Sequence, residues 1–310
     1  MNLRIIQQSK ILVCGPDLRL KRKQIKGDPQ RSPRSANGLV GTIPDDKSQS
    51  EGMKRGSPLS DPVFWLWIVG MFGVSGAFLL QSYYPSVIGP LSNVLPSVGA
   101  AFAFASALLC WRRYGFEIHR RFEAVWFLFT FGTGMWVVAE VTWATYYFVL
   151  NVPVPYPSVA DVFYVGGYLP IILGLAFYFG AFSVAMSRQR LVAAAISIGI
   201  VALVALGLVM PSELSKGLGP LSTLVDLIYP ILDLILFSLT ALCLAIFLGG
   251  RISRWWVLFG AASLLYVVGD EYFLYQVAAG TYYNGSIDDM FFILGYLTFA
   301  IAFHAHRREF

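Results

Sequence analysis

Charged residues are scarce in this chain. Only 13% of its 310 residues are Asp, Glu, Lys or Arg, whereas a soluble domain usually carries about 25%. Apolar residues make up 56% and aromatic residues 15%, and the mean hydropathy is +0.63. This composition excludes an ordinary soluble protein and predicts an all-α integral membrane protein that crosses the bilayer several times.

Cysteine is also rare, and the residue patterns of common enzymes are missing. The chain has three cysteines, and Cys110 and Cys243 lie in apolar runs, which indicates buried small side chains and not a disulfide framework. The sequence contains no H-E-x-x-H, no phosphate-binding G-x-x-x-x-G-K-[ST] and no G-x-S-x-G. We therefore predict that the protein is not an enzyme and has no catalytic residues, metal site or cofactor.

Basic residues are concentrated near the N-terminus. Residues 1–60 contain 12 Lys or Arg and 5 Asp or Glu, a net charge of +7, whereas residues 61–310 contain 11 and 13, a net charge of −2. The first segment has no periodicity and is predicted to be a disordered, basic cytoplasmic tail. A start of translation at Met53 is an alternative hypothesis. Because the excess charge lies in a tail beside a membrane, no nucleic-acid partner is expected.

Eight apolar segments meet or approach the length that a helix needs to cross a hydrocarbon core of about 30 Å. They are residues 62–84, 91–111, 124–150, 158–184, 190–210, 222–248, 254–279 and 287–305. With the N-terminus inside, the cytoplasmic loops and C-terminal tail hold ten arginines, and the outer loops hold only Lys216. This asymmetry predicts a multi-pass protein of the cell membrane with both termini in the cytoplasm. Trp255 and Trp256 are expected in the aromatic belt at the lipid–water interface.

Two parts of the sequence resemble each other. Residues 136–140 (WVVAE) match 266–270 (YVVGD), and residues 161–169 (DVFYVGGYL) match 289–297 (DMFFILGYL). Each copy ends a block of four predicted spans, so we interpret the membrane region as two four-helix repeats, residues 61–186 and 187–310. Since four is an even number, both blocks enter from the same side and the repeats are parallel, with a pseudo-two-fold axis along the membrane normal. A ligand site is expected near this axis and toward the outside.

Several acids lie within the predicted spans, without Lys, Arg or His at a similar depth: Glu140, Asp226, Asp233, Asp270 and Glu271. Ionisable groups at such depth are costly to insert and typically functional. With the nearby aromatic residues Trp143 and Tyr275, and with Tyr168 and Tyr296 at matching positions, they predict an outward-facing pocket for a small cation or polar ligand. The alternative is that neutral carboxyls hydrogen-bond across the bundle and only join its helices.

Asp161 and Asp289 complete the candidate ligand-binding set, although a structural role is also open for them. Each is the fourth residue of an S-x-x-D sequence that begins at Ser158 or Ser286, just before an apolar run. This is the pattern of a capping box, in which the acid accepts a hydrogen bond from the amide of the capping residue. Helix initiation is therefore the favoured interpretation of these two acids, and ligand contact is the alternative.

Residues 156–164 (YPSVADVFY) with Gly167-Tyr168, and residues 280–283 (GTYY) with Asp289 and Gly295-Tyr296, are also distinctive. They resemble the multi-pass sensory regions that precede bacterial diguanylate cyclases, cyclase/phosphodiesterases and some membrane histidine kinases. The resemblance spans residues 62–305 and implies the same membrane fold and a sensing role. Those regions are followed by a cytoplasmic output domain, whereas the present 310 residues contain no GGDEF-like or kinase sequence. A signal is therefore expected to pass to a cytoplasmic partner in trans.

Three functions follow from these patterns. The favoured one is a membrane sensory or binding module without a catalytic output of its own. A transporter of an ion or small solute is the first alternative, because carboxylates at the midplane can carry protons, although the inner halves of the spans are almost wholly apolar. A structural membrane subunit, in which the acids only join helices, is the second.

Overall fold

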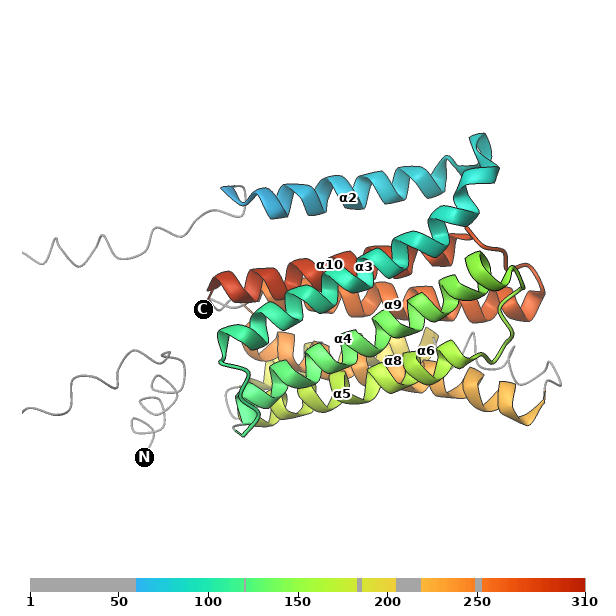
Figure 1. Ribbon diagram of the computed structural model, residues 1–310. Coiled ribbons are helices and arrows are strands. Elements are labelled where there is room, and N and C mark those ends of the chain that lie inside the picture. The colour runs from blue at the N-terminus through green and yellow to red at the C-terminus, as the bar shows by residue number, and fades with distance from the viewer. Residues whose placement is uncertain (1–59, 120, 183–185, 205–218, 249–252, 310) are drawn as a thin grey trace, which may run out of the picture. The chain divides into compact units, whose positions relative to one another are not determined.

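The computed structural model describes residues 60–119, 121–182, 186–204, 219–248 and 253–309 (Figure 1). The predicted tail, apart from Ser60, and the alternative start at Met53 lie outside these residues. The described residues form eight long helices: α2 (Pro62–Leu79), α3 (Pro85–Arg113), α4 (Arg121–Thr145), α5 (Val159–Phe182), α6 (Arg188–Val204), α8 (Pro220–Phe247), α9 (Ser253–Ala279) and α10 (Ile287–Glu309).

The helices confirm a multi-pass membrane protein. Seven of those described are long and apolar enough to cross a membrane. The remaining one, α6, has 17 residues, and residues 205–218 after it lie outside the described part. Large apolar side chains on α2 are exposed, among them Leu66 at 71% and Phe72 at 77%. Such exposure suits lipid, whose tails are as apolar as these side chains.

Two helix boundaries differ from the prediction. The first predicted span reaches residue 84, but α2 ends at Leu79 and a short 3₁₀ turn, Gln81–Tyr83, follows it. The second helix begins at Pro85, earlier than the predicted residue 91, and contains Pro90 and Pro96. Proline favours the first position of a helix, where its missing N–H is not needed. Pro85 takes this position in α3, so residues 85–90, which were predicted to lie before the span, belong to the helix. Helix α4 is extended by a π-helical turn, Tyr146–Leu150.

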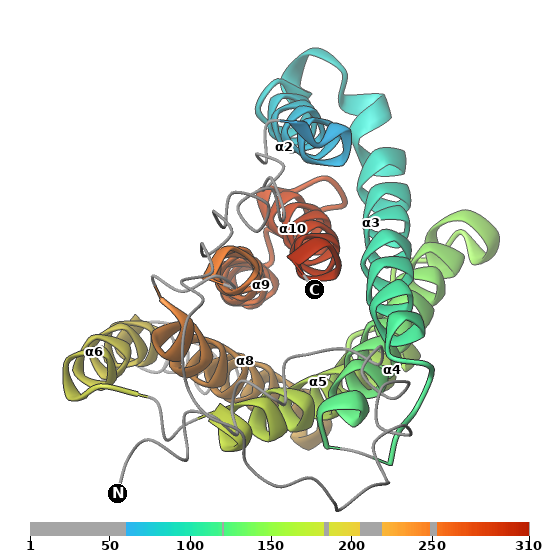
Figure 2. The ribbon, with the colours of Figure 1, turned by 90° about the vertical axis from the view of Figure 1, so that its left-hand side faces the viewer.

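Six helices form a closed ring in which each packs on its two neighbours. The order around the ring is α3, α4, α5, α8, α9 and α10, and α10 returns to α3 (Figure 2). Successive helices along the chain alternate in direction (Figure 1). The other two helices lie outside the ring, α2 against α10 and α6 against α8.

The two ends of the ring differ in charge. The end near the C-terminus, called the basic end, holds all the arginines among the described residues: Arg112, Arg113, Arg121, Arg188, Arg190, Arg254, Arg307 and Arg308. The other end, called the far end, carries the loops 80–84, 151–158 and 280–286. Every Lys or Arg of the described part is therefore separated along the helices from the acids near the far end.

An ion-pair cluster joins α2 to α10 at the basic end. Asp61 caps α2 by accepting a hydrogen bond from the Val63 amide at 3.1 Å. Its other oxygen lies 2.9 Å from His304 Nε2 and 2.7 Å from Arg308 Nη1. Burial raises the pKa of Asp61, but the hydrogen bonds from Arg308 and His304 outweigh burial and hold it below its ordinary value.

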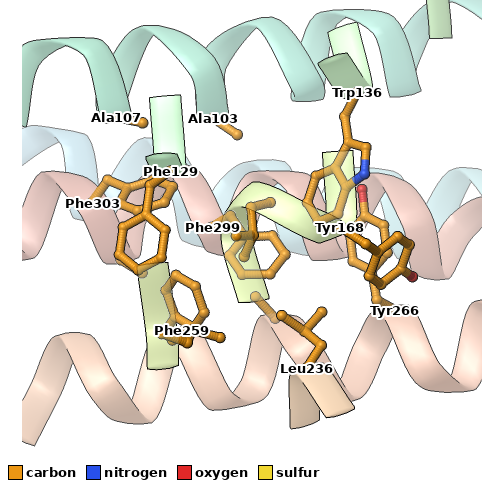
Figure 3. Close-up of a cluster of buried hydrophobic side chains, with 14 of the residues drawn as sticks. Ala103, Ala107, Phe129, Trp136, Tyr168, Leu236, Phe259, Tyr266, Phe299 and Phe303 are labelled. Carbon is orange, nitrogen blue, oxygen red and sulfur yellow. The ribbon is translucent and has the colours of Figure 1, made fainter. Parts of the chain in front are cut away.

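Aromatic side chains fill the ring toward the basic end. Phe129, Phe259, Phe299 and Phe303 are at most 1% exposed and contact one another (Figure 3). Such aromatic pairs contribute about 0.5–1.5 kcal/mol each beyond their buried area. The expectation that Trp255 and Trp256 lie in an interfacial belt is wrong, because both are fully buried in this core. A position near a helix end does not tell which way a side chain points, and these two point from α9 into the ring.

Candidate functional site

A cavity lies inside the ring toward the far end. All six ring helices line it, together with Tyr282 from the loop before α10. Within it, the centres of water-sized molecules have about 70 Å³ of space. One water needs roughly 10–15 Å³ by this measure, so the cavity holds a few waters or one small solute. Four carboxyl residues line its wall: Glu140, Asp161, Asp270 and Asp289.

Two of these acids are held by tyrosines in a crossed arrangement. The hydroxyl of Tyr296 on α10 donates to Glu140 Oε1 on α4 at 2.8 Å. The hydroxyl of Tyr168 on α5 donates to Asp270 Oδ2 on α9, also at 2.8 Å. Each tyrosine thus binds the acid of the other matching segment. Buried hydrogen bonds to charged groups contribute about 1.5–3 kcal/mol, so these bonds fix the acids and also hold the helices together.

Tyr168 also reaches a third acid, which lies behind the cavity wall. Its hydroxyl is 2.6 Å from Oδ1 of Asp233, a residue with no exposed surface. The other oxygen, Asp233 Oδ2, is buried and has no hydrogen-bond partner among the described residues. A phenol hydroxyl has one proton to donate. Both contacts are satisfied when one of the two carboxyls is itself protonated and donates to the tyrosine oxygen.

Asp161 and Asp289 begin helices and also line the cavity. Asp161 Oδ2 accepts from the Ser158 amide at 2.5 Å, and Ser158 Oγ accepts from the Ala160 amide at 3.1 Å, which together form the predicted capping box. The other oxygen of Asp161 accepts from Tyr229 at 2.7 Å. Asp289 departs from the predicted pattern, because it accepts from the amide of Gly285 at 2.7 Å, whereas the amide of Ser286 donates to the Tyr283 carbonyl. Helix initiation and cavity lining are therefore compatible roles for both acids.

Rings at matching positions meet on the wall of the cavity. Trp136 on α4 and Tyr266 on α9 stack with centroids 5.0 Å apart and planes at 12° (Figure 3). Nearer the far end, Trp143 and Phe273 meet edge to face at 6.2 Å. The hydroxyl of Tyr266 is buried on the cavity wall, and its contact with the neighbouring Tyr296 hydroxyl falls short of a well-formed hydrogen bond.

Two glycines admit these rings. A Cβ atom built on Gly167 of α5 would lie 2.4 Å from Trp136 Cδ1, and one built on Gly295 of α10 would lie 2.6 Å from Tyr266 Cδ2. Both distances are far inside van der Waals contact, so neither position accepts a side chain without displacement of the ring. The two glycines are the matching residues of the GYL sequences noted above.

The cavity contains seven of the eleven residues that the sequence predicted: Glu140, Trp143, Asp161, Tyr168, Asp270, Asp289 and Tyr296. Asp233 contacts it through Tyr168. Asp226 is buried and accepts a hydrogen bond from Tyr156, away from the lining. Glu271 is buried beside Asp270 but does not line the cavity. The inclusion of Tyr275 is wrong, because it is 54% exposed and stacks on Tyr272 outside the ring.

The predicted site set did not include part of the aromatic wall, namely Trp136, Tyr164, Tyr266 and Tyr282, and it left out Tyr229, which the sequence had indicated only as a hydrogen-bonding neighbour of the acids. Trp136 and Tyr266 stand at the first position of the matched segments, so the repeat contained a signal for them. Tyr229 lies one helical turn after Asp226, and this spacing indicated that the two side chains share a helix face. Burial raises the pKa of Tyr282 well above its ordinary value, and the neighbouring Asp289 and Asp288 raise it further. Tyr282 therefore remains a hydroxyl donor.

The donor set does not resemble a metal centre. Among the described residues, no group of three or more His, Cys, Asp or Glu side chains is placed to hold a metal ion. No protein-family model, curated protein or solved structure matches the chain. The cavity itself is thus the basis for assigning a function.

Proposed function

We propose that the protein is a membrane-embedded sensory or binding module that takes a small cationic or polar ligand into the cavity. The carrying observation is that four carboxyl residues line one cavity in the ring, whereas the described arginines all lie at the basic end. Buried carboxylates without basic partners favour a positively charged or hydrogen-bonding ligand. In the sensory regions that the sequence resembles, the signal passes to an output domain that follows in the same chain. The present 310 residues contain no GGDEF-like or kinase sequence, and in this proposal the signal passes to a cytoplasmic partner in trans.

The cavity lies, in this proposal, between two parallel four-helix repeats, residues 61–186 and 187–310. The helix contacts support this division, since α3–α4, α4–α5 and α3–α10 correspond to α8–α9, α9–α10 and α8–α5. The crossed tyrosine–carboxyl bonds and the stacking of Trp136 on Tyr266 support it as well. The outer helices depart from the symmetry, because α2 packs on α10 whereas α6 packs on α8.

The proposed orientation places the basic end in the cytoplasm and the far end outside the cell membrane. The arginines at the basic end support it, because positively charged loops stay on the cytoplasmic side. The cavity then faces outward, and the basic end is the surface available to an intracellular partner.

Transport of a small ion or solute is the second candidate, and the buried Asp233 near the middle of α8 favours it. A path from the cavity to the basic end, however, runs into the core of Phe129, Phe259, Phe299 and Phe303. These side chains are at most 1% exposed. Passage would require several packed rings to move together, which favours a binding site closed on the inside.

Thermal unfolding of the purified full chain, in detergent, tests the proposal with a panel of ions and small solutes. A ligand at 100 times its dissociation constant stabilises the native state by about 2.7 kcal/mol. We expect a ligand-dependent rise in Tm that is lost in Glu140→Gln/Asp270→Asn. The matched control is Glu271→Gln, which removes a carboxylate next to Asp270 but outside the cavity lining.

Uptake into proteoliposomes separates the two binding functions, since a sensor binds the ligand without accumulating it. A structural subunit gives a third result. In that case no ligand shifts the Tm, and the double variant changes only the stability of the empty protein.

A further inference from the structure

We infer that the ligand of the cavity is an organic dication of the aliphatic diamine class, with one ammonium group at Glu140–Tyr296 and the other at Asp270–Tyr168. This inference rests on the proposed function and specifies its ligand. It is carried by the charge of the cavity, by the lack of a metal-binding group among the described residues, by the duplication of the polar groups and by the aromatic wall.

The charge of the cavity calls for more than one positive centre. Glu140, Asp161, Asp270 and Asp289 line it, and all described arginines lie at the basic end. Because the Tyr168 hydroxyl has one proton for two acids, the inference assigns a neutral carboxyl to Asp233, which lies behind the cavity wall, and a charged one to Asp270. A single monovalent cation would leave other carboxylates buried without a counter-charge, which costs several kcal/mol per ion. A dication matches the remaining charge better.

The acids are not grouped as the ligands of one metal ion. The described residues contain no group of three or more acidic, histidine or cysteine side chains suited to a metal, whereas calcium takes six to eight oxygen ligands. An organic ammonium group, which pairs with a single carboxylate through charge-assisted hydrogen bonds, therefore suits this wall better than a metal ion.

The polar groups occur twice in the same form. Tyr296 fixes Glu140 and Tyr168 fixes Asp270, each through a bond of 2.8 Å between helices of different halves. Two carboxylates, each oriented by a tyrosine hydroxyl, form two places for an ammonium group, which donates to carboxylates through charge-assisted hydrogen bonds. A molecule with an ammonium group at each end occupies both at once.

The wall around these two places suits the rest of such a molecule. Trp136, Trp143 and Phe273 line the cavity, and aromatic rings attract cations and pack against methylene groups. The hydroxyl of Tyr266, a residue that is 3% exposed, lies on this wall beside the hydroxyl of Tyr296 without a well-formed hydrogen bond to it. The space of about 70 Å³ for water-sized centres limits the ligand to a short chain.

Calorimetric titration of the full chain in nanodiscs tests the inference with straight-chain diamines of increasing length. Each diamine is compared with the monoamine and the diol of the same length, and with Mg²⁺. We expect an optimum of length at which the diamine binds at least about tenfold more tightly than the monoamine, because a second charge-assisted contact is made. The diol and Mg²⁺ are expected not to compete with it.

Variants assign the two ammonium sites. Glu140→Gln and Asp270→Asn should each reduce the affinity for the best diamine to about that for the monoamine, whereas Glu271→Gln should retain it. The inference is overturned if monoamine and diamine bind equally, if Mg²⁺ competes, or if no amine binds. If a neutral solute binds instead and needs Glu140 and Asp270, the inference fails and the proposed function stands. The comparison of wild-type ligands decides the matter even if a variant does not fold.

Discussion

Trp136 and Tyr266 stack at 5.0 Å with nearly parallel planes, and they occupy matching positions in two similar segments of the chain. In the proposed arrangement of two parallel repeats, residues at matching positions touch where the pseudo-two-fold axis passes between them. Phe129 and Phe259, one heptad toward the basic end, are in contact at 5.6 Å, and Trp143 and Phe273, one heptad toward the far end, at 6.2 Å. Helices α4 and α9 thus meet through a column of rings that supports the cavity.

The glycines beside this column give the first prediction. Gly167→Ala and Gly295→Ala should each lower the free energy of unfolding by about 1–3 kcal/mol, the usual cost of overpacking, because the new methyl group would overlap Trp136 or Tyr266. Gly180→Ala on α5 is the matched control, since nothing lies within 4 Å of its Cβ position. Thermal unfolding in detergent measures all three. Equal stability of the three variants would contradict the close ring contacts.

Two tyrosines in one cavity should respond differently to loss of the hydroxyl group. Tyr296→Phe removes a buried donor to Glu140 and should destabilise the empty protein by about 1–3 kcal/mol. Tyr266→Phe removes a hydroxyl whose contact with the Tyr296 hydroxyl does not reach the geometry of a formed hydrogen bond, and it should cost less than about 1 kcal/mol. Chemical unfolding of both variants in the same detergent checks this order. A larger loss for Tyr266→Phe would show that its hydroxyl is bonded in the empty protein.

The Asp61 cluster predicts a stability that depends on pH. Because the pKa of Asp61 is lower in the folded protein than its ordinary value of 3.8, the cluster stabilises the fold at pH values above that value. This contribution is lost as the pH falls through the folded pKa. Asp61→Asn should therefore be less stable than the wild type at neutral pH, and the difference should shrink in acid. Melting temperatures of both proteins between neutral and acidic pH measure it, and a difference that grows in acid would contradict the assignment.

Cysteine labelling tests the orientation. Cys110 and Cys243 are fully buried, so with Cys14 replaced by Ser an added cysteine is expected to dominate the reaction. In intact cells, a membrane-impermeant maleimide should label Tyr283→Cys at the far end, where the tyrosine is 52% exposed. It should label Ile118→Cys, at the basic end and 50% exposed in the native protein, only after the cells are opened. The reverse pattern would invert the proposed topology.

The sequence was sufficient for the membrane class because apolar runs of about 20 residues are typical of helices that cross a bilayer. It also located the acids Glu140 and Asp270, since a carboxylate within such a run is conspicuous. It was insufficient wherever the answer depended on the rotation of a helix about its axis. Tyr275 lies one residue from the buried Gln276, yet it faces outward. The prediction for Trp255 and Trp256 was wrong for the same reason, because these side chains were expected at the lipid–water interface but face the core.

The two hydrogen bonds from Tyr168 to Asp270 and from Tyr296 to Glu140 could not be predicted from the sequence, for a different reason. The repeat indicated that two copies face each other, but which tyrosine meets which acid depends on the order of helices around the ring. Because α3 neighbours α10 and α5 neighbours α8, the segments interlock and do not form two separate bundles. A pairing of Tyr168 with Glu140, within one copy, would have been equally compatible with the spacing of the residues.

Asp233 makes the two tyrosine–carboxyl pairs of the cavity different from each other. Tyr168 contacts both Asp270 and Asp233, whereas Tyr296 donates to Glu140. In a symmetric dimer the two polar pairs would be identical, and a bound molecule could enter either way round with equal energy. A single chain in which one pair carries an additional acid makes the two orientations unequal, so the site can distinguish the head of an unsymmetrical molecule from its tail.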